Sequence, residues 1–572
     1  MSVKGASFVP RPVSVIEEES DEKSFVDRTE VSKAGDQSLT EEKPSQRRQA
    51  SDRSYAFEVS YLVGDQNLVT GDASRKRMSH TVRHLVSKIA EVEPFEPYWE
   101  DLKEIALREK DLASLHMLDR FCGSLVKMDV SHNTIRALDG IPSSTRELTI
   151  THNMLSELTA WDRLGNLQYV DVSNNDIRSL SAFNNLVHLR NLVVDNCGLA
   201  NLDGIRFHDS LLTLRARGNS IEKLNFDGTN LQRMTSLDLE GNKIGEIESL
   251  HELSSLTYLN LKGNQLVKFS SVEPLALKHL IISDNKLRKI DVASMPRLHL
   301  LYADRNKLTT VDGLSRVPHL DSLSLREQGG SRPFDMSFLE TSYEVRKLFL
   351  SGNHLGFFDP PRDFLNLQLL DLANCGLQRL PDNLGQLMPN LRVANLSFNG
   401  LSDVSGLTSI PRLKRLLLAG NRLVDIKPLL SVLSQFPWLT EVDLRDNSVT
   451  QGFYPPVHVV LRYGEAQNTD IFKLPDADPE RDARYCRRLD METRIQRRVY
   501  ERKCVRSCKH LQKLDGLPAN RKVRHIRDVY ELEKEEDPTS YVSDGEGDGE
   551  KAKAKCAADE SERWGIEDSF AG

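Results

Sequence analysis

The hexapeptides LDLEGN (Leu237–Asn242) and LNLKGN (Leu259–Asn264) decide the fold, because each belongs to one unit of a long repeat. The full pattern is L-x-x-L-x-L-x-x-N-x-L, and units follow one another mostly at intervals of 20 to 26 residues. The ninth position is occupied by Asn133, Asn153, Asn175, Asn219, Asn242, Asn264, Asn285, Asn306, Asn353, Asn399, Asn421 and Asn447. Cys197, Cys375 and Gln328 take that position in three further units, and Lys110 takes it in an earlier unit, which gives sixteen units in all.

This periodicity is the leucine-rich-repeat pattern. One coil cannot bury its apolar face alone, whereas stacked coils bury a continuous core. We therefore predict an α/β horseshoe-shaped solenoid, with one parallel strand per coil on the concave face. The convex segments, such as EIESLHELSSL (Glu246–Leu256), indicate loops or 3₁₀ turns.

The asparagines lie where each strand ends, and a side-chain amide can both donate to and accept from loop backbone that would otherwise be buried unpaired. Gln328 is one methylene longer than Asn. We therefore predict that the ladder loosens at Gln328 and that Gly329–Tyr343, GGSRPFDMSFLETSY, leaves the solenoid as a bulge.

The composition divides the chain into five regions. Residues 1–80 are predicted to be a disordered arm, 81–98 a lead-in, and 99–455 the solenoid with an insertion at 329–343. Residues 456–530 are predicted to form a linker, a basic helix and a cap, and 531–572 an acidic disordered tail. Between Arg481 and Lys509 there are eleven Lys or Arg against four Asp or Glu, and Tyr485, Leu489, Val499 and Val505 form a thin apolar stripe. LQKLDGLP (Leu511–Pro518) is typical of a final half-coil.

Bulk properties exclude several classes of protein. The net charge of −8 gives no general attraction to nucleic acid, and no run of about 18 apolar residues exists to span a membrane. The seven cysteines are scattered, as expected of free thiols in a reducing cytosol or nucleus. No phosphate-binding Gly loop, HExxH helix or GxSxG elbow is present, so we expect no enzymatic activity and no cofactor. Cys504, Cys508 and His510 lack a fourth ligand nearby, so we expect no metal site.

The concave face is the expected place of function, because side chains at the third, fifth and seventh positions of each coil point outward. In the early coils these are polar, as at Asp171, Arg215 and Asp238, and later they turn apolar. The apolar set comprises Tyr258, Ile281, Leu300, Tyr302, Phe349, Leu369, Val393 and Leu417. Such residues suit parallel strands that a loop covers, but they also suit a groove for a partner helix or extended peptide. The insertion at 329–343 lies amid this set and is predicted to cover or edge the groove.

Two further features predict regulation by charge. The basic helix, through Arg487, Arg488, Arg494, Arg497 and Arg498, is either a solvated cap or a site for an acidic or phosphorylated partner. RRQAS and RKRMS place Ser51 and Ser79 after basic residues, as basophilic kinases prefer, and VSDGEGD places Ser543 in an acidophilic context.

Six segments together resemble one family. They are LDGIPSSTRELTITHNMLSELTAW (Leu138–Trp161), LDSLSLREQ (Leu320–Gln328), LQLLDLANCGLQRLP (Leu367–Pro381), RLKRLLLAGNRL (Arg412–Leu423), VDLRDNSVTQGFYPP (Val442–Pro456) and LQKLDGLP. Over roughly residues 95 to 530 the chain resembles the fungal leucine-rich-repeat scaffold of the spindle pole body, which anchors the septation-initiation or mitotic-exit network and is distantly related to animal centriolin.

The resemblance implies a non-catalytic platform in the cytoplasm, at the microtubule-organising centre. Its implied partners are a coiled-coil tether at the pole, a small Ras-like GTPase with its kinase, and an NDR-type kinase with its Mob co-activator. Two alternatives remain open at this point: a regulatory repeat subunit of a protein phosphatase, and a nucleic-acid-associated protein, against which the acidic net charge argues.

Overall fold

The computed structural model describes residues 80–206, 208–329, 334–456 and 472–519, together with one antiparallel pair of short strands, β1 (Val9–Pro10) and β2 (Tyr61–Leu62). The disordered arm and tail that we predicted lie outside these residues, apart from that strand pair. So do the candidate phosphorylation sites Ser51, Ser79 and Ser543.

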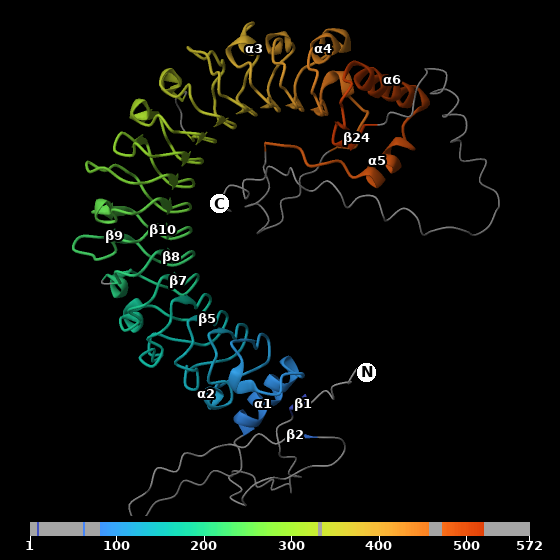
Figure 1. Cartoon of the computed structure of the whole chain (residues 1–572). Coiled ribbons are helices and arrows are strands. Elements are labelled where there is room, and N and C mark those ends of the chain that lie inside the picture. The colour runs from blue at the N-terminus through green and yellow to red at the C-terminus, as the bar shows by residue number, and fades with distance from the viewer. Residues whose placement is uncertain are drawn as a thin grey trace, which may run out of the picture.

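The described repeat region forms a curved solenoid with a parallel sheet lining its inner face (Figure 1). Each of the sixteen repeat units contributes one strand of three residues, which pairs in register with the next. These strands are β3 (Glu104–Ala106), β4 (Lys127–Asp129), β5 (Glu147–Thr149), β6 (Tyr169–Asp171), β7 (Asn191–Val193), β8 (Thr213–Arg215), β10 (Ser236–Asp238), β12 (Tyr258–Asn260), β13 (His279–Ile281), β15 (Leu300–Tyr302), β17 (Ser322–Ser324), β18 (Lys347–Phe349), β19 (Leu369–Asp371), β20 (Val393–Asn395), β21 (Arg415–Leu417) and β22 (Glu441–Asp443). The predicted leucine-rich-repeat fold is confirmed.

The repeat leucines form a single core between the inner sheet and the convex segments. Leu237, Leu239 and Ile244 of one unit are all fully buried, as are their counterparts in most other units. The core therefore grows by stacking, as the pattern predicts.

The convex side consists mainly of short elements, as expected. Its helical turns are α2 (Leu118–Phe121), η2 (Leu180–Phe183), η3 (Asp203–Ile205), η4 (Leu250–Glu252), η5 (Leu314–Arg316), η6 (Ser337–Glu340), α3 (Leu384–Leu387), η7 (Ser405–Leu407) and α4 (Ile426–Leu433). Two short parallel pairs that the sequence did not predict also belong to this side, β9 (Lys223–Asn225) with β11 (Glu246–Glu248) and β14 (Lys289–Asp291) with β16 (Thr310–Asp312). Figure 1 shows β9 on the outer edge, opposite β8 and β10.

A residue with left-handed backbone follows each inner strand, and in twelve of the sixteen units an asparagine comes next. The residue before the ninth position has positive φ in every unit, from Glu109 (53°) to Asp446 (60°). The next side chain then turns inward: Asn175 donates to the carbonyls of Val172 at 2.7 Å and Ile150 at 3.0 Å, and accepts from the Leu155 amide at 3.0 Å. Each ladder amide thus connects two coils through backbone groups that would otherwise be buried without partners.

The predicted loosening at Gln328 is wrong. Its Nε2 donates to the carbonyls of Ala303 at 2.8 Å and Arg326 at 3.1 Å, and its Oε1 accepts from the Leu308 amide at 3.0 Å. Strands β17 and β18 pair in register on either side of this turn. The extra methylene is absorbed by the flexible side chain, so the ladder continues.

The predicted position of the insertion is also wrong for its described part. From Phe334 onward the chain packs on the convex side: η6 contacts β16, and the Asp335 amide donates to Thr309 at 3.3 Å. Phe334 and Phe338 are buried there, with ring centroids 5.7 Å apart. The insertion therefore adds to the convex core instead of covering the concave face.

Both ends of the solenoid carry helices. At the N-terminal end α1 (His80–Val92) buries Val82, Leu85, Val86 and Ile89, the i, i+3, i+4, i+7 spacing of an amphipathic helix. Beyond it, η1 (Trp99–Asp101) buries Trp99, and β3 follows. The apolar residues of α1 belong to the same continuous core as the repeat leucines.

At the C-terminal end the cap contains two helices, α5 (Pro479–Cys486) and α6 (Met491–Ser507), where one was expected. Asp490 divides them, because its carboxylate accepts from the Thr493 amide at 2.8 Å and caps α6. The buried residues of α6 are Arg497, Tyr500 and Cys504. The predicted stripe is divided: Tyr485 lies on α5 and Leu489 between the helices, Val499 is half-buried on α6, and Val505 packs partly buried against the core. No described helix is long and apolar enough to cross a bilayer.

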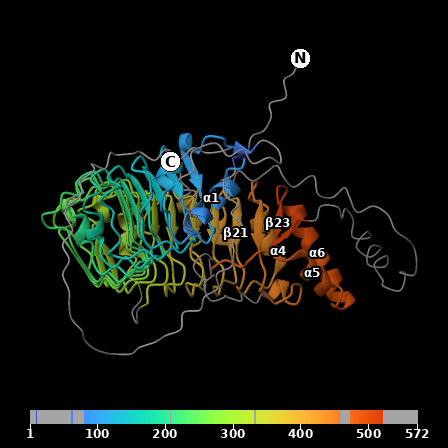
Figure 2. The same ribbon diagram turned by 90° about the horizontal axis from the view of Figure 1, so that it is seen from below.

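The half-coil follows as predicted. After η8 (Ser448–Thr450) and the two helices, β23 (Lys513–Leu514) adds to β22 in parallel, and β24 (Leu517–Pro518) turns back antiparallel to β23. Helix α6 contacts α4, so it extends the convex layer past the last full coil (Figure 2). The predicted C-terminal helical cap is confirmed.

Candidate partner-binding surface

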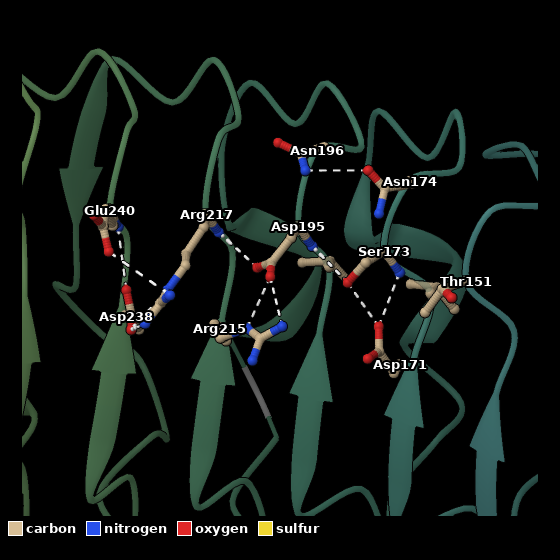
Figure 3. Close-up of polar contacts among 12 residues, drawn as sticks. Thr151, Asp171, Ser173, Asn174, Asp195, Asn196, Arg215, Arg217, Asp238 and Glu240 are labelled. Carbon is tan, nitrogen blue, oxygen red and sulfur yellow. Dashed lines mark hydrogen bonds and ion pairs between the residues drawn. The ribbon is translucent and has the colours of Figure 1, made fainter. Parts of the chain in front are cut away.

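The inner face of the early coils presents charged side chains that pair across neighbouring coils, and Figure 3 shows those between Asp195 and Glu240. Arg215 binds Asp195 at 2.7 Å and Arg217 binds Asp238 at 2.6 Å. Lys262 continues the series, with its Nζ 3.0 Å from Glu240. Because each cation has an anion one coil away, the described surface here alternates in charge and forms no block of one sign.

The inner sheet at β12, β13 and β15 forms the open part of the predicted groove. Tyr258, Ile281 and Tyr302 are each half-buried there. The Tyr258 and His279 rings meet edge to face at 6.3 Å, and Ser322 donates to the Tyr302 hydroxyl at 3.4 Å. Burial raises the pKa of Tyr258 to about 12, so its hydroxyl stays neutral. We call Tyr258, His279, Ile281 and Tyr302 the tyrosine patch.

Two predicted groove residues offer little surface. Leu300 is 8% exposed and Leu417 is 5% exposed, so both belong to the packing of the sheet. Leu369 and Val393 are half-buried on β19 and β20. The predicted apolar set therefore does not form one continuous open groove.

The chain itself covers the inner sheet near the C-terminal coils. Residues 472–477, which we call the strap, run from the level of β18 and β20 to the cap. Phe472 is 4% exposed and its carbonyl accepts from Asn395 Nδ2 at 2.9 Å. Arg326 lies over the Phe349 ring at 4.6 Å and binds Asp371 at 2.7 Å. The same guanidinium is 5.9 Å from the centre of the Phe472 ring.

Hydrogen bonds to its backbone also hold the rest of the strap. Arg445 donates to the Pro475 carbonyl at 2.9 Å while pairing with Asp443 at 2.6 Å. The Ala477 amide donates to Gly516 in the half-coil at 3.1 Å. The strap therefore connects the middle of the sheet to its end.

The five arginines predicted for the basic helix differ in their environments. Arg487 and Arg488 are exposed between α5 and α6, and Arg494 and Arg498 are half-buried on α6. Arg497 is buried: it binds Asp482 at 2.6 Å and the Phe453 carbonyl at 2.9 Å, and lies over the Tyr454 ring at 4.4 Å. Arg497 thus joins the two cap helices and has no surface for a partner.

A buried carboxyl lies beneath the cap. Asp515 accepts from the hydroxyls of Tyr454 at 2.6 Å and Tyr500 at 2.7 Å and from the Leu444 amide at 2.6 Å. Burial, with the nearby Asp443 carboxylate, raises the pKa of Asp515 to about 7. This cluster links the half-coil, α6 and the turn after β22.

Cys504, Cys508 and His510 do not share one environment. Both thiols are buried, and burial raises the pKa of Cys508 to about 11. The exposed His510 ring stacks on Trp438 with centroids 5.3 Å apart. No group of three metal-binding side chains lies together among the residues that the structure describes.

Sequence reasoning missed the strap, Arg445 and Asp515. One signal was available: FKLP (Phe472–Pro475) places an aromatic and an aliphatic residue in an otherwise polar linker. Asp515 and Arg445 gave no such signal, because charged residues are frequent at their repeat positions.

Known proteins support the repeat assignment. A Leucine Rich Repeat family model matches residues 366–387. The septation initiation network scaffold protein cdc11 of Schizosaccharomyces pombe is 33% identical over 446 residues, covering 76% of this chain and 42% of that protein. The chain is a leucine-rich-repeat protein related to this scaffold. The predicted resemblance is confirmed, and the chain spans less than half the length of this relative.

Other similarities are shorter or confined to the fold. A homologue of a protein phosphatase 1 regulatory inhibitor subunit from Arabidopsis thaliana is 28% identical over 151 residues, covering 21% of this chain and 46% of that protein. Among solved structures, YopM of Yersinia enterocolitica is 24% identical with a TM-score of 0.46, covering 64% of this chain and 77% of that one. An internalin of Listeria monocytogenes is 20% identical with a TM-score of 0.41, covering 60% and 88%.

Proposed function

We propose that this leucine-rich-repeat protein is a non-catalytic scaffold that anchors a septation-initiation or mitotic-exit signalling module at the spindle pole body. The observation that supports this most is the 33% identity to cdc11 over 446 residues. A solenoid of sixteen coils also offers the extended surface that a scaffold requires.

In this proposal the tyrosine patch contacts a coiled-coil tether at the pole. Its aromatic rings and Ile281 combine apolar area with hydroxyl and imidazole groups, which suits a partner helix better than a charged ligand. The early coils, with their paired charges, then flank the contact as a polar rim.

The module held there would contain a small Ras-like GTPase with its kinase and an NDR-type kinase with its Mob co-activator. Holding these proteins on one chain raises their local concentration, which speeds encounters without any catalytic residue in the scaffold. The exposed Arg487 and Arg488 offer guanidinium groups to a phosphorylated member of the module.

Imaging of the full chain with a fluorescent tag, beside a tubulin marker, tests the proposal in dividing cells of its source organism. We expect a focus at each spindle pole. A diffuse signal from a fusion shown to be intact would contradict pole anchoring.

A second candidate function is regulation of a protein phosphatase, which the 28% identity to the phosphatase inhibitor homologue favours. That similarity covers 21% of this chain, against 76% for cdc11. Recovery of a phosphatase catalytic subunit in stoichiometric amounts with the tagged chain would favour this candidate.

A further inference from the structure

The strap occupies the inner sheet in the way that a bound peptide would. An extended segment lies across the ends of several parallel strands, with one aromatic side chain buried and its backbone carbonyls taken by side-chain donors. These donors, Asn395 and Arg445, come from coils separated by two units, so the contact extends along the sheet.

The slot for the Phe472 ring depends on a residue without a side chain. A Cβ at Gly352 would lie 2.7 Å from Cζ of Phe472, which is closer than carbon atoms approach in proteins. Arg326, held by Asp371 and by the face of Phe349, forms another side of the slot. The slot is therefore formed by the backbone at Gly352 and by the Arg326 side chain, which is fixed by its own contacts within the sheet.

The contacts after Phe472 define the chemistry of the ligand. Lys473 Nζ lies 3.9 Å from the carboxylate of Glu441, Leu474 is 9% exposed, and the carbonyl of Pro475 accepts from Arg445. The site thus fits an aromatic, then a basic, then an aliphatic residue, followed by proline. Proline suits the last place because it favours an extended chain and has no N–H that would need an acceptor.

We infer that the strap is an internal ligand of a peptide site, and that an extended partner segment of the form aromatic–basic–aliphatic–proline binds there by displacing it. In the proposed scaffold that segment belongs to the pole tether, and only this naming of the partner rests on the proposed function. Two of the strap's anchoring ion pairs, Lys473–Glu441 and Asp476–Lys513, involve partly exposed groups and hold it weakly. The buried ring of Phe472 is the main barrier to exchange.

Fluorescence polarisation of a labelled peptide, FKLPDAD (Phe472–Asp478), tests the inference against the full chain. In the wild-type chain the strap competes at the high effective concentration of a tethered ligand, so binding is weak. In the Phe472→Ala chain the slot is open, and we expect apparent affinity to rise about tenfold or more, since it scales with the open fraction. Phe357→Ala, which removes a 42% exposed ring beside Arg379, is the matched control and leaves affinity unchanged.

A peptide with Phe replaced by Ala must not bind the opened chain, because the ring supplies the buried contact. Lys473→Glu is a second way to loosen the strap: it repels Glu441 without altering the slot, and should also raise affinity for the peptide. The inference is overturned if folded Phe472→Ala and Lys473→Glu chains bind the peptide no better than wild type. It is equally overturned if the peptide lacking its ring binds as well as the parent. Neither outcome depends on the spindle pole, so the proposed function is tested separately by imaging.

Discussion

Gln328 and Asn306 donate to the same carbonyl oxygen, that of Ala303, at 2.8 Å and 3.0 Å. The two side chains come from successive coils and differ by one methylene, yet each connects its turn to the coil before it. The sequence pattern therefore changes at Gln328, whereas the hydrogen-bond network continues unchanged through it.

The first prediction follows from this shared acceptor. Gln328→Ala leaves the Leu308 amide and the Ala303 carbonyl without one partner each, so we expect the free energy of unfolding to fall by about 1–3 kcal/mol. Urea denaturation measures this free energy, with Asn306→Ala as the reference for an ordinary ladder position. A Gln328→Ala chain as stable as wild type would mean that this coil does not need the ladder.

The sequence predicted the repeat coils well because their contacts are between neighbouring units. Leu237 is buried in its own coil and Asn242 bonds to the coil before it, so one periodic pattern specifies strand, turn and core at once. The strap escaped prediction because Asn395 and Phe472 are 77 positions apart and the linker that leads to Phe472 has no periodicity.

The insertion and the cap show two other limits. A break in the repeat reveals that Phe334 and Phe338 leave the coil, but not on which face they pack. In the cap, the count of charges identified a basic region, whereas burial of Arg497 depends on where Asp482 lies in three dimensions. The start of α6 carries a local signal, since Asp490 is a preferred N-cap residue and the acidic Glu492 lies in the first turn.

The second prediction concerns the cap. Arg497→Ala leaves the buried Asp482 carboxylate unpaired, and breaking a buried pair in this way costs about 3–5 kcal/mol. We expect hydrogen exchange to increase across α5, α6 and β23. Arg487→Ala, at an exposed position of the same region, is the control and should leave exchange unaltered. Equal exchange in the two variants would refute a structural role for Arg497.

The third prediction is a pH dependence from Asp515. Its folded pKa of about 7 lies above the unfolded value of about 3.9, so the folded chain holds this proton more tightly. Its contribution to stability is therefore present at low pH and is lost as the pH rises from about 4 to about 7. We expect Asp515→Asn to remove this loss. In thermal melts, the melting temperature of the variant should therefore rise relative to that of wild type across that pH range.

Asp476 provides the control for this pH series. Although burial acts to raise its pKa, the hydrogen bond from Lys513 lowers the pKa of Asp476 below the ordinary value. Its contribution is complete above the unfolded pKa and is lost only at lower pH. The melting temperature of Asp476→Asn should therefore change in parallel with that of wild type between pH 4.5 and 7.5. If Asp515→Asn and Asp476→Asn show the same pH trend, Asp515 is not the source of the pH dependence.

The fourth prediction tests the tyrosine patch. Tyr302→Glu places a carboxylate on the half-buried surface where we propose that the tether binds, and a desolvated, unpaired charge there weakens association strongly. We expect the pole-to-cytoplasm fluorescence ratio to fall to about the level of free tag while the melting profile stays cooperative. Tyr169→Glu makes the same change at a 39% exposed tyrosine on β6, among the paired charges, and should still localise. If folded Tyr302→Glu also localises, the tyrosine patch is not where the tether contacts the solenoid.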